Sequence, residues 1–408
     1  MLYHMHELQR AFLRPLVAFS DAGSQLFSSP YSPWSYMPIS RQLAAGYELM
    51  HRIGKEYQKP AWGLPHTEID GKPVRVTEVV ADDKPFCRLV HFQRDERAVA
   101  KRRDPRVLLV APLSGHHATL LRDTVRALLP AHDVYVTDWV DARMVPLSAG
   151  PFHLDDYVAY IQDFISALGP DLHVISVCQP TVPVLAAISL LASANDPAQP
   201  RSMVMMGGPI DPRESPTQVN RLATTKSYDW FESQLIHAVP PAYPGAGRKV
   251  YPGFLQHAGF MAMNPDRHVK SHYDFYLDLL RGDDSDAEMH RRFYDEYNAV
   301  LDMPAEFYLD TIRVVFQESR LPEGTWQIDG RPVRPADIRK TALLTVEGEL
   351  DDISGQGQTR AAIKLCAGIP AARKSHYTAV GAGHYGIFSG RRWRELICPK
   401  IAAFIRAS

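Results

Sequence analysis

Short apolar runs rich in β-branched residues alternate with longer helical or loop spans from residue 74 onward. Runs of this kind predict buried strands, and their alternation with helical spans is typical of a wound α/β sheet. The first two runs are close enough to pair antiparallel, whereas the later ones leave room for the crossover helices of parallel strands. We therefore expect an eight-stranded, mostly parallel sheet with strands at Val74–Ala81, Cys87–Phe92, Arg106–Ala111, Asp133–Thr137, Leu172–Val177, Ser202–Met206, Thr341–Val346 and Ser375–Val380.

The first 72 residues lack this alternation and predict a helical extension. Residues 28–38 are turn-rich, and Ser40 is a suitable cap for a helix in which Leu43 and Tyr47 fall near one face. We expect this apolar face to pack on the core, because its burial stabilises an amphipathic helix. The chain then divides into an extension (1–72), the first part of the core (73–208), an insertion (209–338) and the second part of the core (339–408).

The insertion between the sixth and seventh predicted strands is rich in aromatic residues. Residues 211–330 contain 17 of the 40 Phe, Trp and Tyr residues of the chain. An open α/β fold places its ligand site at the carboxyl edge of the sheet, where such an insertion is suited to form a helical cap. Because large apolar side chains are mainly buried, we expect most of these aromatics to form the cap's own core and the remainder to face a substrate.

Composition and charge exclude several classes of protein. The 45 basic and 46 acidic residues give a net charge of −1, which disfavours a nucleic-acid binder that works through bulk positive charge. The four cysteines are widely spaced, so we expect neither a zinc finger nor a disulfide scaffold, and a reducing compartment is indicated. The charged amino terminus lacks the apolar run of a signal peptide, and the longest apolar run, Val182–Ala194, is too short for a transmembrane segment.

A candidate nucleophile stands at the end of the fifth predicted strand. Leu172–Val177 ends at Cys178, and a predicted helix follows from Thr181. A nucleophile on such a turn is held at the head of the sheet, beside the amide of the next residue and the helix amino terminus. The usual G-x-S-x-G elbow has glycines where this chain has Ser176 and Pro180, but serine is small and proline suits a first helical turn. The alternative is a buried, inert cysteine.

An acidic loop follows the seventh predicted strand and supplies a candidate acid. Asp351 is our first choice, Asp352 is close behind it, and Glu347 and Glu349 are weaker. Paired aspartates in a loop are usually solvated turn residues, so the loop alone is weak evidence.

The eighth predicted strand ends in glycines that free the following loop to present His384. His376 lies at the start of the same strand, which is the wrong edge of the sheet. A loop histidine alone is more often a surface residue than a catalyst. The order Cys178, Asp351, His384 after the fifth, seventh and eighth predicted strands is a threefold coincidence, and it predicts a nucleophile, an acid that orients the histidine, and a general base.

Attack on an acyl carbon also needs two donors for the oxyanion. We expect one to be the backbone amide of Gln179, directly after the nucleophile, and the other to be the amide of Leu113 or Ser114 in the loop after the third predicted strand.

Neither a metal nor a cofactor is expected. The adjacent His116 and His117 have no acidic residue or third histidine at a recognisable ligand spacing. The glycines of Gly381-Ala-Gly383 fall short of a dinucleotide fingerprint and follow the last predicted strand rather than the first.

With these residues assembled, the chain resembles the intracellular polyhydroxybutyrate depolymerases, relatives of the polyhydroxyalkanoate synthases. The resemblance rests on the segments MLYHMHELQRAFLRPLVAF, VISVCQPTVPVLAA, VEGELDDISGQGQT and VGAGHYGIFSGRRW. It implies an α/β-hydrolase fold and a triad of Cys178, Asp351 and His384. It also implies a cytoplasmic enzyme on the surface of polyhydroxybutyrate granules that releases 3-hydroxybutyrate oligomers or monomers.

Alternatives stay open at this point. The synthases share the trio, but they resemble G-x-C-x-G at the nucleophile and Asp-His at the acid, where this chain has Ser176-Val-Cys178-Gln-Pro180 and Asp351-Asp352. A granule-coating protein without catalysis is a second alternative, and the amino-terminal helices are then candidates for dimerisation or granule docking. A homo-oligomer is compatible with the sequence.

Overall fold

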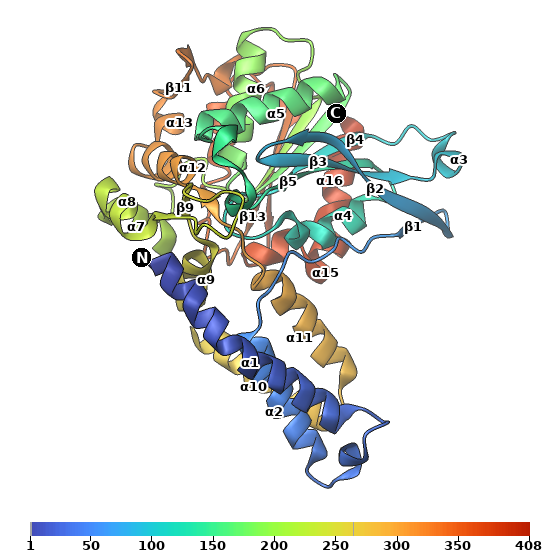
Figure 1. Ribbon diagram of the computed structural model, residues 1–408. Helices are drawn as coiled ribbons and strands as arrows, with labels where there is room; N and C mark the ends of the chain where they lie inside the picture. Colours follow the sequence, from blue (N-terminus) through green and yellow to red (C-terminus); the bar gives the residue numbers. More distant parts are fainter. Residues whose placement is uncertain (1, 264) are drawn as a thin grey trace.

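A nine-stranded sheet forms the centre of the part that the computed structural model describes, residues 2–263 and 265–408 (Figure 1). Its strand order is β1-β2-β3-β5-β4-β6-β7-β13-β14. The strands from β5 to β14 are parallel, whereas β1, β2, β3 and β5 pair antiparallel. The bounds are β1 His66–Ile69, β2 Lys72–Lys84, β3 Cys87–Arg94, β4 Arg106–Val110, β5 Asp133–Trp139, β6 Leu172–Val177, β7 Ser202–Met206, β13 Ala342–Gly348 and β14 Lys374–Ala379.

The eight predicted strands are all present, but the predicted number was one too low because β1 was missed. β1 has four residues, of which Ile69 alone is buried, so it offers no apolar run. The sequence of the turn that joins β1 to β2 nevertheless indicates a hairpin. Asp70 and Gly71 form a two-residue loop with φ of 52° and 75°, and Asp-Gly favours this hairpin turn.

Helices cover both faces of the sheet because the side chains of its central strands alternate. In β6, Leu172 and Val174 face the cluster that contains α5 and α6, whereas Ile175 and Val177 face the cluster that contains α4 and α16. The bounds are α3 Glu96–Val99, α4 Arg122–Leu128, α5 Leu154–Leu168, α6 Thr181–Ser193, α14 Ala361–Leu365, α15 Gly390–Arg392 and α16 Cys398–Ala407.

The segment between β7 and β13 divides into two structural parts. One part lies over the carboxyl edge of the sheet, and the other is the helical hairpin of α10 and α11, which leaves the body of the molecule (Figure 1). The four-part division of the chain that we expected from the sequence stays a prediction. The bounds are α7 Gln218–Thr225, α8 Tyr228–Leu235, β8 His237–Ala238, β9 Lys249–Tyr251, α9 Gly253–Met263, α10 Pro265–Arg281, α11 Asp284–Tyr297, β10 Met303–Pro304, α12 Ala305–Asp310, α13 Arg320–Glu323, β11 Gln327–Ile328 and β12 Arg331–Pro332.

Helices α1 (Leu2–Ser28) and α2 (Ser40–Gly54) pack on each other, and α2 also packs on α10. Together with α10 and α11 they form an arm that projects from the body (Figure 1). Ion pairs join the two hairpins: Arg52 with Asp295 at 2.9 Å and Arg291 with Glu48 at 2.6 Å. Among the described residues, none of the helices is long and apolar enough for a membrane crossing.

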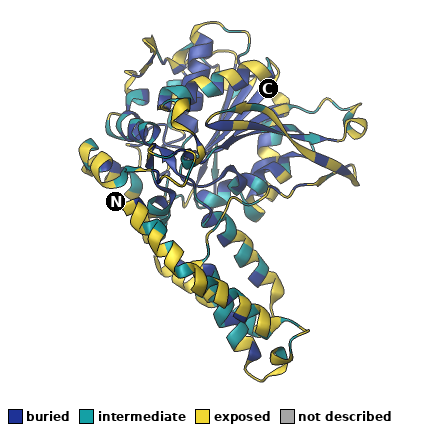
Figure 2. Cartoon of the chain, in the orientation of Figure 1, coloured by how far each residue is buried: buried dark blue, intermediate teal, exposed yellow. Residues whose placement is uncertain are grey.

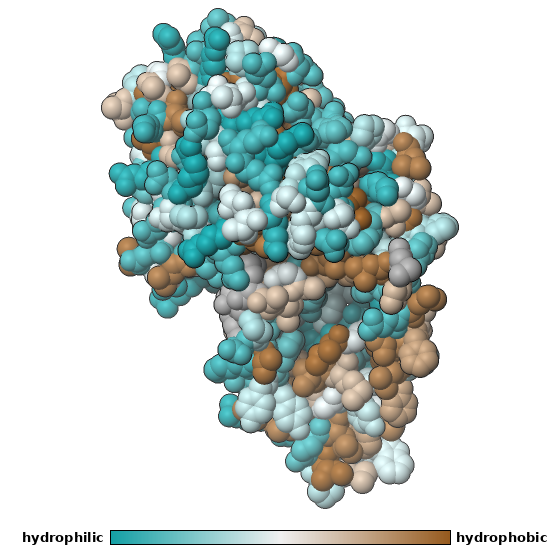
Figure 3. All heavy atoms as spheres, turned by 90° about the vertical axis from the view of Figure 1, so that its left-hand side faces the viewer, coloured by the Kyte–Doolittle hydropathy of each residue, from teal (hydrophilic) through white to brown (hydrophobic). Residues whose placement is uncertain are grey.

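We expected the apolar face of the amino-terminal helices to pack on the core, but in the structure α1 contacts the body only at its beginning. Helix α1 meets the body near its first turns, where the Tyr3 hydroxyl donates to Asp302 at 2.7 Å and His6 stacks on Phe254. Its buried positions Ser20 and Gly23 are small, and its large apolar side chains are mostly exposed (Figure 2). Apolar residues gather over the arm in Figure 3, whereas the body above it is largely hydrophilic on that face.

Close packing of α1 on α2 depends on Gly23. A Cβ atom there would lie 2.9 Å from the ring of Tyr47, whereas a Cβ at Gly46 of α2 would meet no atom within 4 Å. We expect Gly23→Ala to destabilise the arm by about 1–3 kcal/mol through overpacking. Gly46→Ala, the matched control, should stabilise α2 by up to about 1 kcal/mol. Amide hydrogen exchange in α1 and α2 measures both effects, and equal protection in the two variants would contradict the packing described.

Candidate active site

The turn after β6 holds Cys178 in a left-handed conformation with φ of 68°. Few non-glycine residues adopt this region, and such strain persists only where the surroundings impose it. Here the Cys178 amide donates to the Met206 carbonyl at 2.7 Å, and the Thr181 amide donates to the Cys178 carbonyl at 3.1 Å as α6 begins. The predicted strand-to-helix turn is therefore present, with the cysteine at the head of the sheet.

A residue that the sequence reasoning overlooked explains how the turn forms without the usual flanking glycines. A Cβ atom at Gly208, after β7, would lie 1.9 Å from Thr181 Oγ1 and 2.3 Å from the Cys178 carbonyl oxygen. The close approach that an elbow needs is thus provided by the neighbouring segment. The signal was the Gly207-Gly208 pair directly after β7, which faces the turn because β6 and β7 are paired.

His384 and Asp351 lie beside the cysteine. The Nδ1 atom of His384 is 2.8 Å from Asp351 Oδ2, and Cys178 lies close enough to the same histidine to raise its pKa. The other carboxylate oxygen of Asp351 accepts from the amides of Ile353 and Ser354 at 2.9 and 2.8 Å. The side chain of Asp351 is fully buried. The structure therefore brings together the three side chains that the sequence put in order.

The weaker acidic candidates have other partners. Asp352 is exposed, and Glu347 accepts from the amides of Gly357 and Arg360. Glu349 accepts from the amide of Gly381 at 2.7 Å and so supports the loop that carries His384. Asp351 is thus the carboxylate that reaches the histidine.

The surroundings of His384 favour its protonated form. Burial lowers the pKa of His384. Its interactions with Asp351 and Cys178 raise this pKa by more than burial lowers it. The pKa of His384 therefore stands well above its ordinary value. A protonated imidazole beside a thiolate is the reactive form of a cysteine nucleophile.

The expected oxyanion donors lie around the thiol. Leu113, Ser114 and Gln179 line the same cavity as Cys178. Among the hydrogen bonds of residues 2–263 and 265–408, none uses the backbone amides of these three residues as donors. The amides are therefore available to a ligand at the sulfur.

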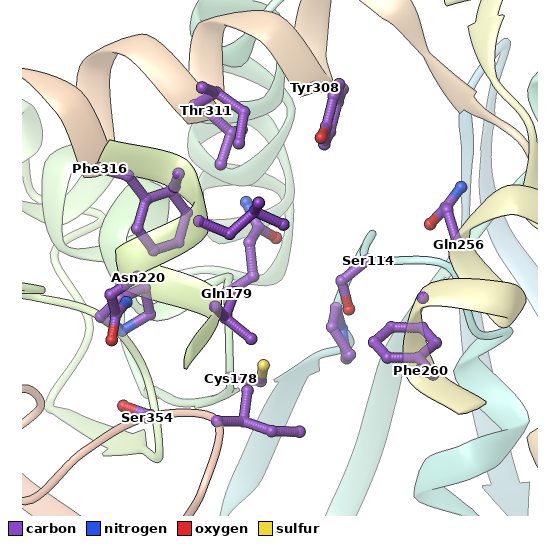
Figure 4. Close-up of a pocket in the computed structure, with 18 of the residues that line it drawn as sticks. Ser114, Cys178, Gln179, Asn220, Gln256, Phe260, Tyr308, Thr311, Phe316 and Ser354 are labelled. Atoms are coloured by element: carbon purple, nitrogen blue, oxygen red, sulfur yellow. The ribbon is translucent and has the colours of Figure 1, made fainter. Parts of the chain in front are cut away.

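The cavity beside the thiol has a volume of about 640 Å³ and mostly apolar walls (Figure 4). It takes side chains from the sheet edge, from α7 and α9, and from α12 and the π-helix that continues it. Six aromatic residues of the insertion line it: Phe231, Tyr251, Phe260, Phe307, Tyr308 and Phe316.

Two of the polar side chains in this lining, those of Gln179 and Gln256, have buried atoms without a partner. The side-chain atoms Nε2 and Oε1 of Gln179 are buried without a hydrogen-bond partner in the described part of the chain, and so is Oε1 of Gln256. Buried polar groups without partners are costly, so these are positions where a polar group of a ligand compensates.

His116 and His117 are side chains of the packed interior. The Nε2 atom of His116 lies 3.1 Å from the Tyr297 carbonyl, and its ring stacks on Phe260. Burial lowers the pKa of His116 to about 4 and that of His117 to about 3, so both are neutral at pH 7. Within the described residues, no group of three His, Cys, Asp or Glu side chains is arranged to hold a metal.

The parallel sheet, its antiparallel edge and the nucleophile turn between β6 and α6 define an α/β-hydrolase. The family described as PHB de-polymerase C-terminus matches residues 207–408, which include β13, β14, Asp351 and His384. The second half of the chain is thus similar to PHB depolymerases, and this similarity on an α/β-hydrolase fold supports the hydrolysis of carboxylic esters.

Several solved structures are similar in fold. A monoacylglycerol lipase from Paleococcus ferrophilus is 14% identical, with a TM-score of 0.43 over 74% of this chain and 95% of that one. A 2-hydroxy-6-oxo-6-phenylhexa-2,4-dienoate hydrolase from Rhodococcus sp. strain RHA1 is 11% identical, with a TM-score of 0.45 over 82% and 99%. No protein of curated function matches the sequence.

The Asp351→Asn substitution tests the ion pair. It keeps the shape of the side chain but removes a charge that raises the pKa of His384, so the thiolate loses its cationic partner at a lower pH. Fewer molecules then hold an imidazolium beside the sulfur at about pH 6, and a fall of one pKa unit in His384 would slow alkylation of Cys178 by iodoacetamide by about tenfold.

The other three cysteines are buried, so the alkylated peptide reports on Cys178. Asp352→Asn is the matched control and should keep the native rate. Equal alkylation of Asp351→Asn and native protein would show that the carboxylate does not support the pair.

Proposed function

We propose that the protein hydrolyses poly(3-hydroxybutyrate) through a thioester on Cys178, releasing 3-hydroxybutyrate oligomers or monomers. The observation that carries this proposal is the left-handed Cys178, beside the His384–Asp351 pair, in the wall of an apolar cavity. Its occurrence in a PHB-depolymerase-like α/β-hydrolase supports a polyester as the substrate.

The cavity suits such a substrate in size and polarity. Pockets of about 300–1,000 Å³ hold drug-sized ligands, so a volume near 640 Å³ accommodates several short hydroxyacyl units. A polyester carries no charge, and its methyl and methylene groups match apolar and aromatic walls. The side-chain amide nitrogen of Gln179 lies in the same cavity as Cys178 and can donate to an ester carbonyl of the bound polyester chain.

The first half of the reaction forms the acyl-enzyme. The Cys178 thiolate attacks the ester carbonyl carbon, and the oxyanion is stabilised by the amide of Gln179 together with that of Leu113 or Ser114. The carbon–oxygen bond to the departing chain then breaks, and the His384 imidazolium gives its proton to the departing oxygen, which becomes a free hydroxyl group. Asp351 keeps the imidazole in the tautomer and orientation that this transfer needs.

The second half of the reaction hydrolyses the thioester and restores the free enzyme. Neutral His384 takes a proton from water, and the resulting hydroxide attacks the thioester carbon. The carbon–sulfur bond breaks, the thiolate is regenerated beside the imidazolium, and the acyl group leaves as a carboxylic acid. Replacement of water by the thiol of CoA at this step would give a CoA thioester instead.

The proposed place of action is the granule surface in the cytoplasm. The polymer is insoluble, so the enzyme has to act on chains at that surface. The net charge of −1 is compatible with an uncharged polyester as partner.

Cys178→Ala tests the nucleophile on amorphous poly(3-hydroxybutyrate) granules. Removal of a nucleophile that acts in concert with a general base typically costs several orders of magnitude, so we expect 3-hydroxybutyrate release to fall at least about a thousandfold. Cys398→Ala is the control, since that buried thiol lies away from the cavity, and it should keep the native rate.

Chromatography of the products with and without CoA identifies the acyl acceptor. Equal release by native protein and Cys178→Ala would refute the nucleophile assignment. Polymer formation with release of CoA from 3-hydroxybutyryl-CoA would assign a synthase instead, and granule association without hydrolysis would assign a coating protein.

A further inference from the structure

We propose that the outer face of α1 is the surface by which the protein adsorbs to its polyester granule, which places the granule beside the wall of the catalytic cavity. This inference rests on the proposed function. The face, called the outer stripe here, comprises Met5, Leu8, Phe12, Leu16 and Phe19. Their spacing of three or four residues puts them along one side of a helix.

The outer stripe reverses the usual pattern of an amphipathic helix. The exposed fraction is 84% for Phe12 and 71% for Leu8, whereas the buried positions further along α1 are the small residues Ser20 and Gly23. The second half of α1 reaches α2 through small residues: Gly23 lies against Tyr47, and Val17 lies against Gly54. Phe19 also meets the ring of Tyr47 edge to face, but most of the surface of the stripe stays exposed, and exposed apolar patches of this kind mark interaction sites.

The exposed apolar character continues to the end of the arm. The short helix Pro33–Tyr36 and its flanks join α1 to α2, and Tyr31 there is 95% exposed, with Trp34 and Tyr36 also exposed. Aromatic side chains with one polar atom suit a boundary between an apolar phase and water. The view in Figure 3 shows how much of this arm is apolar on one side.

The charge of the outer stripe indicates the chemistry of its partner. The stripe carries no charged side chain, and the nearby Glu7 and Arg10 are engaged elsewhere, Arg10 with Glu56 and Glu7 with the Tyr243 hydroxyl. A neutral, apolar surface is the complement of an uncharged polyester. An acidic or basic partner would find no opposite charge on this face.

A second copy of this chain fits the face less well. A coiled-coil seam needs large apolar residues at two positions of each heptad. Met5, Phe12, Phe19 and Leu26 are seven residues apart, but the companion positions three residues further on are Leu8, Pro15 and Ala22. Beyond the first turns of α1, a second helix would therefore find large apolar side chains at only one position of each heptad. A polyester surface needs no such regular spacing and is the better occupant.

The position of the outer stripe connects it to the active site. The first turns of α1 contact α9, where Phe254 stacks on His6 and meets Tyr3 edge to face. The same helix supplies Gln256, Gly259 and Phe260 to the cavity wall. Figure 1 shows the start of α1 meeting the body beside α9. Only α1 itself and α9 therefore lie between a granule bound along α1 and the cavity.

The triple variant Leu8→Gln, Phe12→Gln, Leu16→Gln tests the proposal in the full-length protein. These side chains are exposed, so their exchange for a polar residue of helical preference leaves the packing intact. The control triple variant is Val80→Thr, Leu147→Gln, Leu396→Gln, which removes exposed apolar side chains from the body. Each protein is assayed for sedimentation with amorphous poly(3-hydroxybutyrate) granules and for hydrolysis of the soluble 3-hydroxybutyrate trimer.

We expect granule binding by the α1 variant to fall at least about tenfold, since three large apolar contacts are lost, with trimer hydrolysis within about twofold of native. The control variant should match native protein in both assays. Undiminished granule binding by the α1 variant would overturn the docking surface while trimer hydrolysis upholds the proposed function. Failure of native protein to cleave either substrate would instead overturn the function. Light scattering that showed a native dimer dissociating in the α1 variant would assign the face to self-association and overturn the proposal.

Discussion

The arrangement of the whole site depends on the left-handed backbone of Cys178. A non-glycine residue in this region costs about 1–3 kcal/mol, and the cost is met by the surrounding contacts. The hydrogen bond to Met206 holds the turn against the end of β7, and Gly208 leaves room for this close approach because it has no side chain. The thiol therefore stands at the head of the sheet, in line with the loops after β13 and β14. Each of the other elements of the site takes its position from that point.

One long insertion links catalysis to the shape of the molecule. Its α7, α9 and α12 supply much of the cavity wall, and its α10 and α11 hold the amino-terminal hairpin through the Arg52–Asp295 and Arg291–Glu48 pairs. The same stretch of chain thus encloses a small apolar volume and supports a long apolar surface outside. This combination fits the proposed polyester substrate: the surface would hold the particle, and the cavity would take one chain from it.

The sequence predicted the features that depend on local pattern. The eight strands follow from apolar runs, and the trio follows from the positions of Cys178, Asp351 and His384 after three of them. What it could not predict depends on contacts between distant segments. Gly208 replaces the missing elbow glycines across a pair of strands, and the choice between neighbouring aspartates depends on which way the loop turns. The arm was mispredicted because an apolar helix face reveals no partner, and here the small residues of α1 provide the packing.

The most direct test of the account is the identity of the residue that carries the acyl group. Native protein mixed with 3-hydroxybutyrate trimer and quenched in acid within the first turnover should yield one modified peptide, with a 3-hydroxybutyryl unit or oligomer as a thioester on Cys178. His384→Gln should abolish the label, because the thiolate loses its cationic partner. A labelled serine, or turnover of the trimer with Cys178 unmodified at every quench time, would contradict the account.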